Sequence, residues 1–362
     1  MRFAAEPPHE HGRAERTAVL LVNLGSPAAP TAAALRRYLA EFLSDRRVVE
    51  IPKPLWWLLL HGVLLRVRPK QSAAKYATIW TPEGSPLLSW SARQAKRLQG
   101  DLGERGHQLL IRFAMRYGDP AIPSVLDELK AEGATRILVL PLYPQYAAAT
   151  TASTFDAVAD WARRVRRLPE LRFVNHYHDD AGYLDALAES VRAHWQREGR
   201  ADKLVMSFHG LPARTLALGD PYHCECLATA RLLAERLHLK RDDYVVSFQS
   251  RLGRAKWLQP YTEPTLKKLA ADGVRSIDAI CPGFPADNLE TLEEIGVEGK
   301  AAFLGAGGRE FRLIPCLNDR DAWIRSLADL VERHLHGWPT RPADAAALEA
   351  QARRAVAAGA AR

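Results

Sequence analysis

The chain alternates short apolar runs with helical segments, and it does so twice. Short apolar runs bounded by Gly or Pro are typical of buried parallel strands, and strands that alternate with helices predict a parallel sheet covered by helices. With 362 residues, the chain is long enough for two such units. We therefore predict an α/β fold of two doubly wound, Rossmann-like lobes with a cleft between them. The clearest runs are residues 17–23, 109–114, 136–140, 171–176, 203–207, 243–248 and 276–281.

The two arrays meet near residues 166–169, which sets the expected domain boundary. The N-terminal residues are rich in Pro, His, Arg and Glu and lack the apolar core of a signal peptide. The C-terminal end is rich in Ala and Arg, so we expect a frayed helix or a disordered tail. The expected parts are a disordered segment (1–16), an N-terminal lobe (17–168), a C-terminal lobe (169–318), a helix that packs back on a lobe (319–341) and the tail (342–362).

The net charge indicates which kinds of partner the protein binds, and the cysteine content indicates its redox environment. Lys and Arg exceed Asp and Glu by 50 − 42 = 8, which favours an anionic membrane face, a carboxylate-bearing small molecule or nucleic acid. No Lys/Arg run carries interleaved aromatic residues, so we expect no nucleic-acid partner. Four Cys do not make a disulfide framework in a chain of this length, which fits a reducing cytoplasm.

Residues 54–67 form an unusually apolar segment that carries Trp56 and Trp57 and is followed by Arg66, Arg68 and Lys70. An apolar, Trp-bearing helix with a basic end is typical of a helix on a membrane surface. The same composition fits a buried core helix or the wall of a pocket for a large apolar ligand. If the segment lies on a membrane, the protein attaches to the anionic inner membrane from the cytoplasm.

His209 ends the apolar run that starts at Lys203, directly before a Gly and shortly before a Pro. Ligands of open α/β sheets bind beyond the carboxyl ends of the strands, so His209 is expected at a binding edge. The ordinary pKa of an imidazole suits it to accept protons near neutral pH. The alternative is a histidine that is hydrogen-bonded within a strand-end turn.

Asp287, Glu290, Glu294 and Glu298 are spaced three and four residues apart after another predicted strand. This spacing predicts one acidic face of a helix, and such a face can simply be solvated. Beside His209, however, the carboxylates make a donor set suited to iron or zinc. So few protein ligands indicate a metal that is passed on rather than held permanently.

A set of short motifs follows in order between Leu21 and Pro315, and together they resemble the ferrochelatase family. The motifs are residues 21–27, 141–146, 207–212, 219–222, 248–253, 257–258, 281–284 and 287–295. The resemblance implies a chelatase-like, two-lobed fold with a tetrapyrrole in the cleft. It also implies insertion of ferrous iron into protoporphyrin IX to form protohaem, the final step of haem biosynthesis. The alternatives are a related chelatase for coproporphyrin or another metal, and a non-catalytic two-lobed protein that binds a metal or a tetrapyrrole.

The family motifs assign roles to residues of this chain. His209 and Glu290 correspond to the iron site in the C-terminal lobe, and Asp287, Glu294 and Glu298 to a polar path toward it. His209 is expected to accept the pyrrole protons. Some members carry a His at the position of Asn288, so this site has one imidazole fewer. The expected porphyrin-binding residues are Leu24 facing the macrocycle, Ser85, Arg116, Tyr117 and Arg251 for the propionates, and Tyr143, Tyr146, Trp257 and Phe284 packing on the ring, for which core packing is the alternative.

No cofactor is expected beyond the substrate iron. Some ferrochelatases bind an iron–sulfur cluster, and four Cys equal the number that a cluster needs. Cys224 and Cys226 begin a predicted helix, however, while Cys281 ends a strand and fits an ordinary buried thiol; the fourth is Cys316. We therefore expect no cluster.

Overall fold

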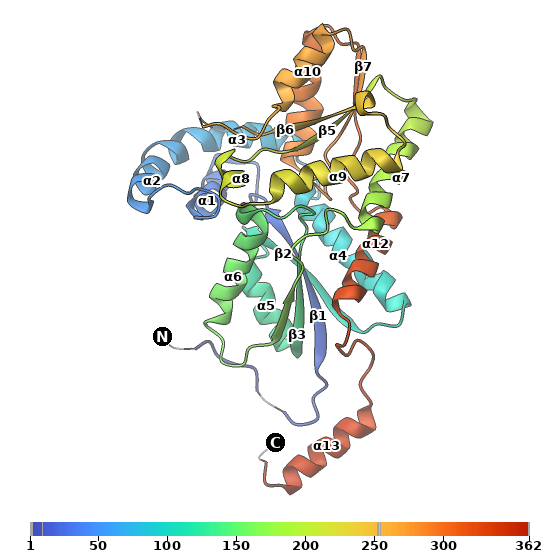
Figure 1. The fold of residues 1–362 in the computed structure, drawn as a ribbon. Helices are drawn as coiled ribbons and strands as arrows, with labels where there is room; N and C mark the ends of the chain where they lie inside the picture. The colour runs from blue at the N-terminus through green and yellow to red at the C-terminus, as the bar shows by residue number, and fades with distance from the viewer. Residues whose placement is uncertain (1–2, 9, 252, 254, 361–362) are drawn as a thin grey trace.

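A computed structural model describes residues 3–8, 10–251, 253 and 255–360, and it contains two four-stranded parallel sheets (Figure 1). The predicted α/β fold with two parallel sheets is confirmed. The first sheet has the order β2-β1-β3-β4 and the second the order β6-β5-β7-β8. The strands are β1 (Arg16–Gly25), β2 (Leu109–Tyr117), β3 (Ala134–Pro141), β4 (Glu170–Phe173), β5 (Lys203–His209), β6 (Tyr244–Gln249), β7 (Ser276–Ile280) and β8 (Glu310–Leu313).

Both sheets repeat one topology, and this decides where the binding edges lie. In each sheet the chain passes from the first strand to one neighbour and then returns to the other side of the first strand. The crevice at this reversal, beyond the carboxyl ends of the strands, is where open α/β sheets bind ligands. One reversal lies between β1 and β3, and the other lies between β5 and β7.

Helices surround both sheets, with α1 to α3 on one side of the molecule and α4, α7 and α12 on the other (Figure 1). Three segments are π-helices, and the longest of them follows β7. The helices are α1 (Ala32–Ser44), α2 (Lys53–Leu59), η1 (Leu60–Leu64), α3 (Leu65–Ile79), α4 (Pro86–Glu104), α5 (Ile122–Ala131), η2 (Ala148–Ala152), α6 (Ser153–Ala162), α7 (Ala181–Glu198), α8 (Arg214–Ala217), α9 (Tyr222–Arg236), η3 (Arg241–Asp243), α10 (Thr262–Ala271), η4 (Glu290–Gly299), α11 (Lys300–Gly305), α12 (Asp321–His334) and α13 (Ala345–Ala357).

One continuous hydrophobic core joins the two lobes. It contains Leu21 of β1 and Met206 and Phe208 of β5, which are fully buried. Trp323 of α12 and Leu187 of α7 belong to the same cluster, and α12 packs against both α7 and α4. Because burial of apolar surface is the main stabilising force, this shared core fixes the lobes on each other. The expected C-terminal helix therefore packs between the lobes.

The strand near residue 171 differs from the sequence prediction. It was expected to open the C-terminal lobe, but β4 is an edge strand of the first sheet and pairs with β3, with Ile137 opposite Leu171. β4 is only four residues long and is partly exposed, so its sequence does not indicate which sheet it joins. The strand β8 occupies the same place in the second sheet. It was not predicted as a strand, because it is only four residues long and starts at an exposed residue.

The two ends of the chain lie along the N-terminal lobe (Figure 1). Before β1, in the segment expected to be disordered, Glu6 forms an ion pair with Lys130, and the backbone N–H of Ala4 donates to Arg164. At the other end, Asp344 caps the helix α13 by accepting hydrogen bonds from Ala346 and Ala347. None of the residues of α13 is buried.

Candidate functional site

A large cleft lies beyond the carboxyl ends of both sheets. Its cavity measures about 1040 Å³, at the upper end of the usual range for small-molecule sites. The loops that follow β1, β3, β5 and β7 all contribute to its wall, so the reversal points of the two sheets face the same space. A cavity of this size fits a large, flat, mostly apolar ligand.

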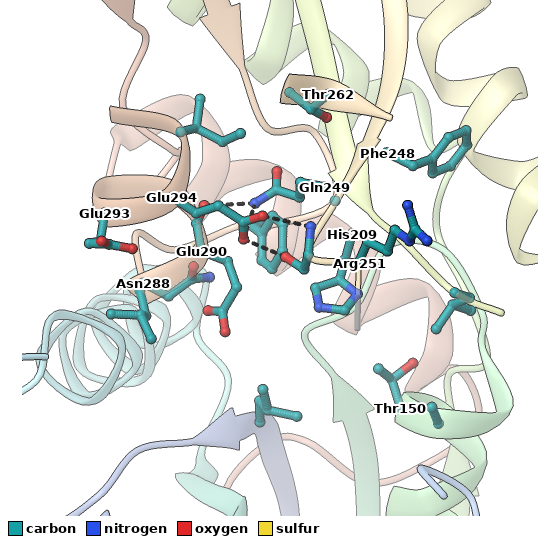
Figure 2. Close-up of a pocket in the computed structure, with 18 of the residues that line it drawn as sticks. Thr150, His209, Phe248, Gln249, Arg251, Thr262, Asn288, Glu290, Glu293 and Glu294 are labelled. Atoms are coloured by element: carbon teal, nitrogen blue, oxygen red, sulfur yellow. Dashed lines mark hydrogen bonds between the residues drawn. The ribbon is translucent and has the colours of Figure 1, made fainter. Parts of the chain in front are cut away.

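His209 is the last residue of β5, and its side chain lines the cleft (Figure 2). Its Nδ1 lies 2.7 Å from the carbonyl oxygen of Gly210, which can only accept a hydrogen bond. Nδ1 therefore carries the proton, and Nε2 of a neutral ring carries a free lone pair. The hydroxyl of Tyr222 donates to the His209 carbonyl at 2.9 Å and fixes the strand end. This arrangement presents a proton acceptor or a metal ligand to the cavity.

Two glycines allow the backbone at the cleft to close tightly. A Cβ at Gly210 would lie 2.6 Å from the carbonyl oxygen of Gln249 and 3.2 Å from the Trp257 ring. In the equivalent loop after β1, Gly25 has a φ of 118° and approaches the carbonyl of Tyr117. No side chain fits at either position without moving the neighbouring strand. The motif glycines therefore hold His209 and the β1 loop at the cavity wall.

Glu290 faces His209 across the cleft (Figure 2). It begins the π-helix η4, which follows β7 after a short loop. Glu290 and His209 thus flank the reversal point between β5 and β7. Burial raises the pKa of the Glu290 carboxyl above its ordinary value, although the neighbouring His209 opposes this shift. A half-buried carboxylate opposite an imidazole lone pair has the donor types that a divalent first-row metal accepts.

Glu294 is held by hydrogen bonds from the end of β6. The backbone N–H of Ser250 donates to its Oε1 at 2.6 Å, and the Ser250 hydroxyl also binds the carboxylate. The side-chain amide of Gln249 lies 3.3 Å from Glu294 and 2.7 Å from the carbonyl oxygen of Glu290 (Figure 2). Ser207 in turn donates to Gln249 at 2.8 Å. Gln249 and Ser250 therefore position the acidic helix against the second sheet.

Glu298 lies further along η4 and forms an ion pair with a lysine side chain. Lys75 of α3 lies 2.6 Å from Glu298 and 3.1 Å from Glu293. Glu293 also lines the cleft but was missed from the sequence, although it follows Glu290 by three residues and this spacing places the two on neighbouring positions of a helix face. Burial raises the pKa of Glu293, and Lys75 opposes this shift. The outer end of the predicted acidic path is thus bridged by a lysine.

Asp287 differs from the sequence prediction, because it does not line the cleft. The predicted α-helix would have placed it on the same face as Glu290, but the helix starts only after Asn288, whose side-chain oxygen accepts the Thr291 N–H at 3.0 Å. The Asp287 carboxylate accepts hydrogen bonds from Asn318 Nδ2 at 2.7 Å and from the Cys316 N–H at 3.1 Å. Its observed contacts are structural, and they tie the start of η4 to the loop before α12.

The predicted porphyrin-binding residues separate into two groups. Those that line the cavity are Leu24, Ser85, Tyr143, Arg251, Trp257 and Phe284. Those that do not line it in the described part of the chain are Arg116, Tyr117 and Tyr146. Arg116 and Tyr117 share a partner distant in the sequence, Asp45, which a single sequence does not reveal.

Asp45 explains why Arg116 and Tyr117 point away from the cleft. Its carboxylate lies 2.6 Å from Arg116 and 2.8 Å from the Tyr117 hydroxyl, and it accepts a further hydrogen bond from Ser153 at 2.6 Å. Burial would raise the pKa of Asp45, but these hydrogen bonds and the positive charge lower it overall. The expected contact of Arg116 and Tyr117 with propionates is thus replaced by a buried ionic network. Tyr146 instead donates its backbone N–H to Glu225 at 2.7 Å.

Several polar residues of the cleft were missed. Arg68, Lys75 and Lys267 line the cavity beside Arg251 and provide positive charge. For Trp257, which was predicted from the sequence, the structure adds that its indole N–H is buried without a hydrogen-bond partner among the described residues. The motif at residues 248–253 pointed to Arg251, but Lys75 and Lys267 lie in the helices α3 and α10 outside any recognised motif.

The four cysteines do not form a common group in the described structure. Cys224 is exposed, whereas Cys226, Cys281 and Cys316 are buried. Burial raises the pKa of these three thiols well above the ordinary value, so they remain protonated at neutral pH.

The apolar segment around Trp57 lies mostly on the surface, so the core interpretation is wrong for most of it. α2 has no buried residue and projects from the molecule near α1 (Figure 1). Leu60 and Leu65 do face the interior. The exposed apolar side chains, which we call the apolar patch, are Leu55, Trp57, Leu58, Leu59, Val63 and Val67. Within the described residues, no helix combines the length and apolarity needed to cross a bilayer.

Comparison with known proteins identifies the family. The ferrochelatase family model matches residues 16–335, which include the cleft and both sheets. The chain belongs to the ferrochelatase family. It is 67% identical to a ferrochelatase of Methylibium petroleiphilum, over 98% of each chain, and 63% identical to one of a Polaromonas species, over 100% of each chain. The family predicted from the motifs is thus confirmed.

Solved structures with low sequence identity share the fold. SirB from Bacillus subtilis with Fe³⁺ matches with a TM-score of 0.54 at 14% identity, covering 89% of this chain and 96% of that one. The sirohydrochlorin chelatase SirB from Bacillus subtilis subspecies spizizenii in complex with cobalt matches with a TM-score of 0.51 at 13% identity, covering 88% and 95%. The predicted chelatase-like, two-lobed architecture is confirmed by these likenesses.

Proposed function

We propose that this protein inserts Fe²⁺ into protoporphyrin IX to form protohaem, with His209 and Glu290 at the reaction centre. Membership of the ferrochelatase family makes it an enzyme that inserts iron into a porphyrin for haem synthesis. The observation that carries the assignment of residues is the pair itself: an imidazole with a free Nε2 faces a half-buried carboxylate across a cavity of about 1040 Å³.

The reaction exchanges two protons for one metal ion. A free-base porphyrin carries two inner N–H groups, and both protons must leave when Fe²⁺ binds the four nitrogens. His209 Nε2 accepts these protons in turn and passes them to water, because the Nδ1–H bond to Gly210 keeps Nε2 available. Glu290 binds the incoming Fe²⁺ through its carboxylate. One carboxylate and one imidazole hold the ion weakly enough to release it to the porphyrin.

The cleft favours the reacting shape of the ring. In a flat porphyrin the inner N–H groups lie in the plane and block the metal, whereas bending exposes the nitrogens. A cavity that binds a bent ring more tightly than a flat one lowers the barrier. Leu24 at the end of β1 and Phe284 after β7 come from opposite lobes and provide apolar parts of the cavity wall. Leu24 cannot ligate a metal, so we assign it packing against the macrocycle.

The propionates of the porphyrin require cations or hydrogen-bond donors. Arg251 lines the cleft and, with the unpartnered indole N–H of Trp257, offers such donors near the end of β6. Ser85 and Lys267 line the same cavity. We assign the propionates to this side of the cleft rather than to Arg116, which is bound to Asp45.

Iron reaches Glu290 along η4, in this proposal. Glu294 and Glu298 are four residues apart, and a π-helix has more than four residues per turn because its hydrogen bonds join residues five apart. Residues at this spacing therefore remain on nearly the same side of the helix, and all three glutamates line the cavity. The Glu298 end is the more exposed one, which gives the route a direction from solvent to His209.

The apolar patch supports a second proposal, attachment to an anionic membrane surface. Trp57, Leu58 and Leu55 are 59%, 63% and 63% exposed, which is unusual for large apolar residues that lie together. Arg66 and Arg68 follow on the same segment and are exposed, as expected for a surface that contacts anionic lipid. This surface lies beside the cleft, since Arg68 also lines the cavity.

A continuous assay with purified protein tests the proposed reaction. Fe²⁺ supplied under anaerobic conditions with protoporphyrin IX should give the absorption spectrum of protohaem, faster than the same reaction with coproporphyrin. A faster reaction with coproporphyrin would change the assigned substrate but leave the protein in the same family. Porphyrin binding without any metal insertion would contradict the enzymatic assignment.

A further inference from the structure

Three ligating side chains meet outside the cleft. His176 and His178 lie in the connection between β4 and α7, and Glu225 lies in the first turn of α9. One ligating atom from each residue can be chosen so that all three lie within 4.8 Å of one another. Among the residues that the structure describes, this is the only such group of three or more His, Cys, Asp or Glu side chains.

The two imidazoles face the two oxygens of one carboxylate. Nδ1 of His176 lies 2.7 Å from Glu225 Oε1, and Nδ1 of His178 lies 3.5 Å from Oε2. The ring centroids are 5.0 Å apart and the ring planes are tilted by 54°. The rings therefore do not stack on each other but converge on the carboxylate from two directions.

The hydrogen-bonding capacity of His178 Nδ1 is not satisfied. The atom is buried and has no hydrogen-bond partner among the described residues. A buried polar atom without a partner costs free energy, so such an atom in a native protein requires an explanation. Glu225 is also buried, which makes an uncompensated negative charge costly there. A cation bound among the three side chains would satisfy both groups.

The donor set matches borderline divalent ions. Two imidazoles and one carboxylate with an open fourth position occur in zinc sites, and the same set binds ferrous iron. Tyr146 donates its backbone N–H to Glu225 Oε2 at 2.7 Å, the kind of outer contact that orients a ligating carboxylate. We propose that His176, His178 and Glu225 form a second metal site, separate from the cleft, that binds a divalent first-row cation such as Zn²⁺.

A cation at this site links segments from both lobes. Gln145, from the loop after β3, donates to Thr229 of α9 at 2.9 Å, and Thr229 donates to the carbonyl of His178 at 2.8 Å. α9 also carries Tyr222, whose hydroxyl binds the strand end at His209. The second site therefore stabilises the junction behind the cleft wall and takes no part in metal transfer. Zn²⁺ binding there should raise the melting temperature.

Calorimetric titration of the metal-free, full-length protein with Zn²⁺ tests the proposal. The background carries His209→Ala and Glu290→Gln, which remove the two proposed iron ligands of the cleft, so that a Zn²⁺ site that depends on His176 can be measured apart from them. We expect one Zn²⁺ per chain in this background. Adding His176→Ala should weaken its binding by more than the roughly 10–100-fold loss that is typical of outer-shell changes. His336→Ala, at an exposed histidine outside the cluster, is the matched control and should leave binding unchanged.

A second readout separates a metal site from a simple hydrogen-bonded cluster. Zn²⁺ should raise the melting temperature of the background protein but not that of the His176→Ala variant, and Glu225→Gln should behave like His176→Ala. His176 has a side chain that is 49% exposed, so its removal should not prevent folding, and the single variant His176→Ala should retain iron insertion within roughly twofold. Equal Zn²⁺ affinity and an equal thermal shift with and without His176 would overturn the proposal.

Discussion

Lys75 Nζ lies 2.6 Å from the carboxylate of Glu298, so a lysine from α3 bridges the outer end of the acidic π-helix. The same nitrogen lies 3.1 Å from Glu293. Four carboxylates along one short stretch repel one another, and a bound cation relieves this repulsion. The protein supplies one cation itself, from a helix that is distant in the sequence. Lys75 therefore occupies a position where an incoming metal ion would be attracted.

Lys75→Met should make Fe²⁺ bind more readily to the outer carboxylates. Without the lysine, Glu293 and Glu298 attract the metal without competition, so the apparent KM for Fe²⁺ should fall by up to about fivefold, the equivalent of about 1 kcal/mol for a partly exposed ion pair. The KM for porphyrin should change little. Steady-state kinetics with iron varied at fixed porphyrin would measure this effect, with Lys70→Met as a control on the same helix. A higher KM for iron in Lys75→Met would show that the lysine organises the path rather than competing with iron.

His209→Ala should abolish iron insertion while porphyrin binding remains nearly intact. The imidazole is the group we assign to accept the pyrrole protons, whereas the apolar cavity walls provide most of the affinity. Porphyrin binding can be followed by quenching of protein fluorescence and turnover by haem absorbance. The matched control is His223→Ala, because His223 stacks on Phe248 close by but does not line the cavity. Substantial turnover by His209→Ala would remove the residue from its proposed role.

The glutamates of η4 should differ in a graded way. Glu290→Gln should lower turnover by orders of magnitude, because it changes the proposed metal site. Glu294→Gln and Glu298→Gln should chiefly raise the apparent KM for Fe²⁺. Asp287→Asn should lower the free energy of unfolding without a specific effect on iron, because the Asp287 carboxylate binds Asn318 and Cys316 rather than facing the cleft. If Glu290→Gln keeps the parent's iron dependence, Glu290 has no place in the mechanism.

Features that depend on local sequence pattern were predicted, whereas features that depend on contacts between distant segments were not. Strand-end positions such as His209 follow from local pattern, since a run that stops at Gly and Pro marks the sheet edge. The direction of Asp287 required knowing that the helix is of the π type and starts only after Asn288, and no local spacing shows this. Arg116 was misplaced because its partner, Asp45, lies 71 residues away. Contacts between distant segments decide such cases, and a single sequence does not contain them.

Asp45→Asn should destabilise the protein at neutral pH by about 3 kcal/mol, because it leaves the largely buried guanidinium of Arg116 without a counter-charge. The pKa of Asp45 is lower in the folded protein than its ordinary value. Its stabilising contribution is therefore fully present above about pH 4 and is lost as the pH falls through the lower, folded-state pKa. The difference between parent and variant in urea unfolding should shrink below pH 4. Asp156→Asn, in an exposed pair with Arg47, should cost about 1 kcal/mol or less. Similar losses for both variants would contradict the buried network.

The apolar patch should bind anionic vesicles weakly and in a salt-sensitive way. Replacing Trp57 and Leu58 with Ser removes two large exposed apolar side chains, so partitioning should fall at least about tenfold, since each side chain contributes about 1.5 kcal/mol or more when buried. High salt should also reduce binding, because Arg66 and Arg68 act through screened charge. Co-sedimentation with vesicles containing phosphatidylserine measures both effects. Leu168→Ser, at a residue that is 52% exposed in the N-terminal lobe, is the control. If the parent fails to sediment with these vesicles even at low salt, the patch does not contact the membrane.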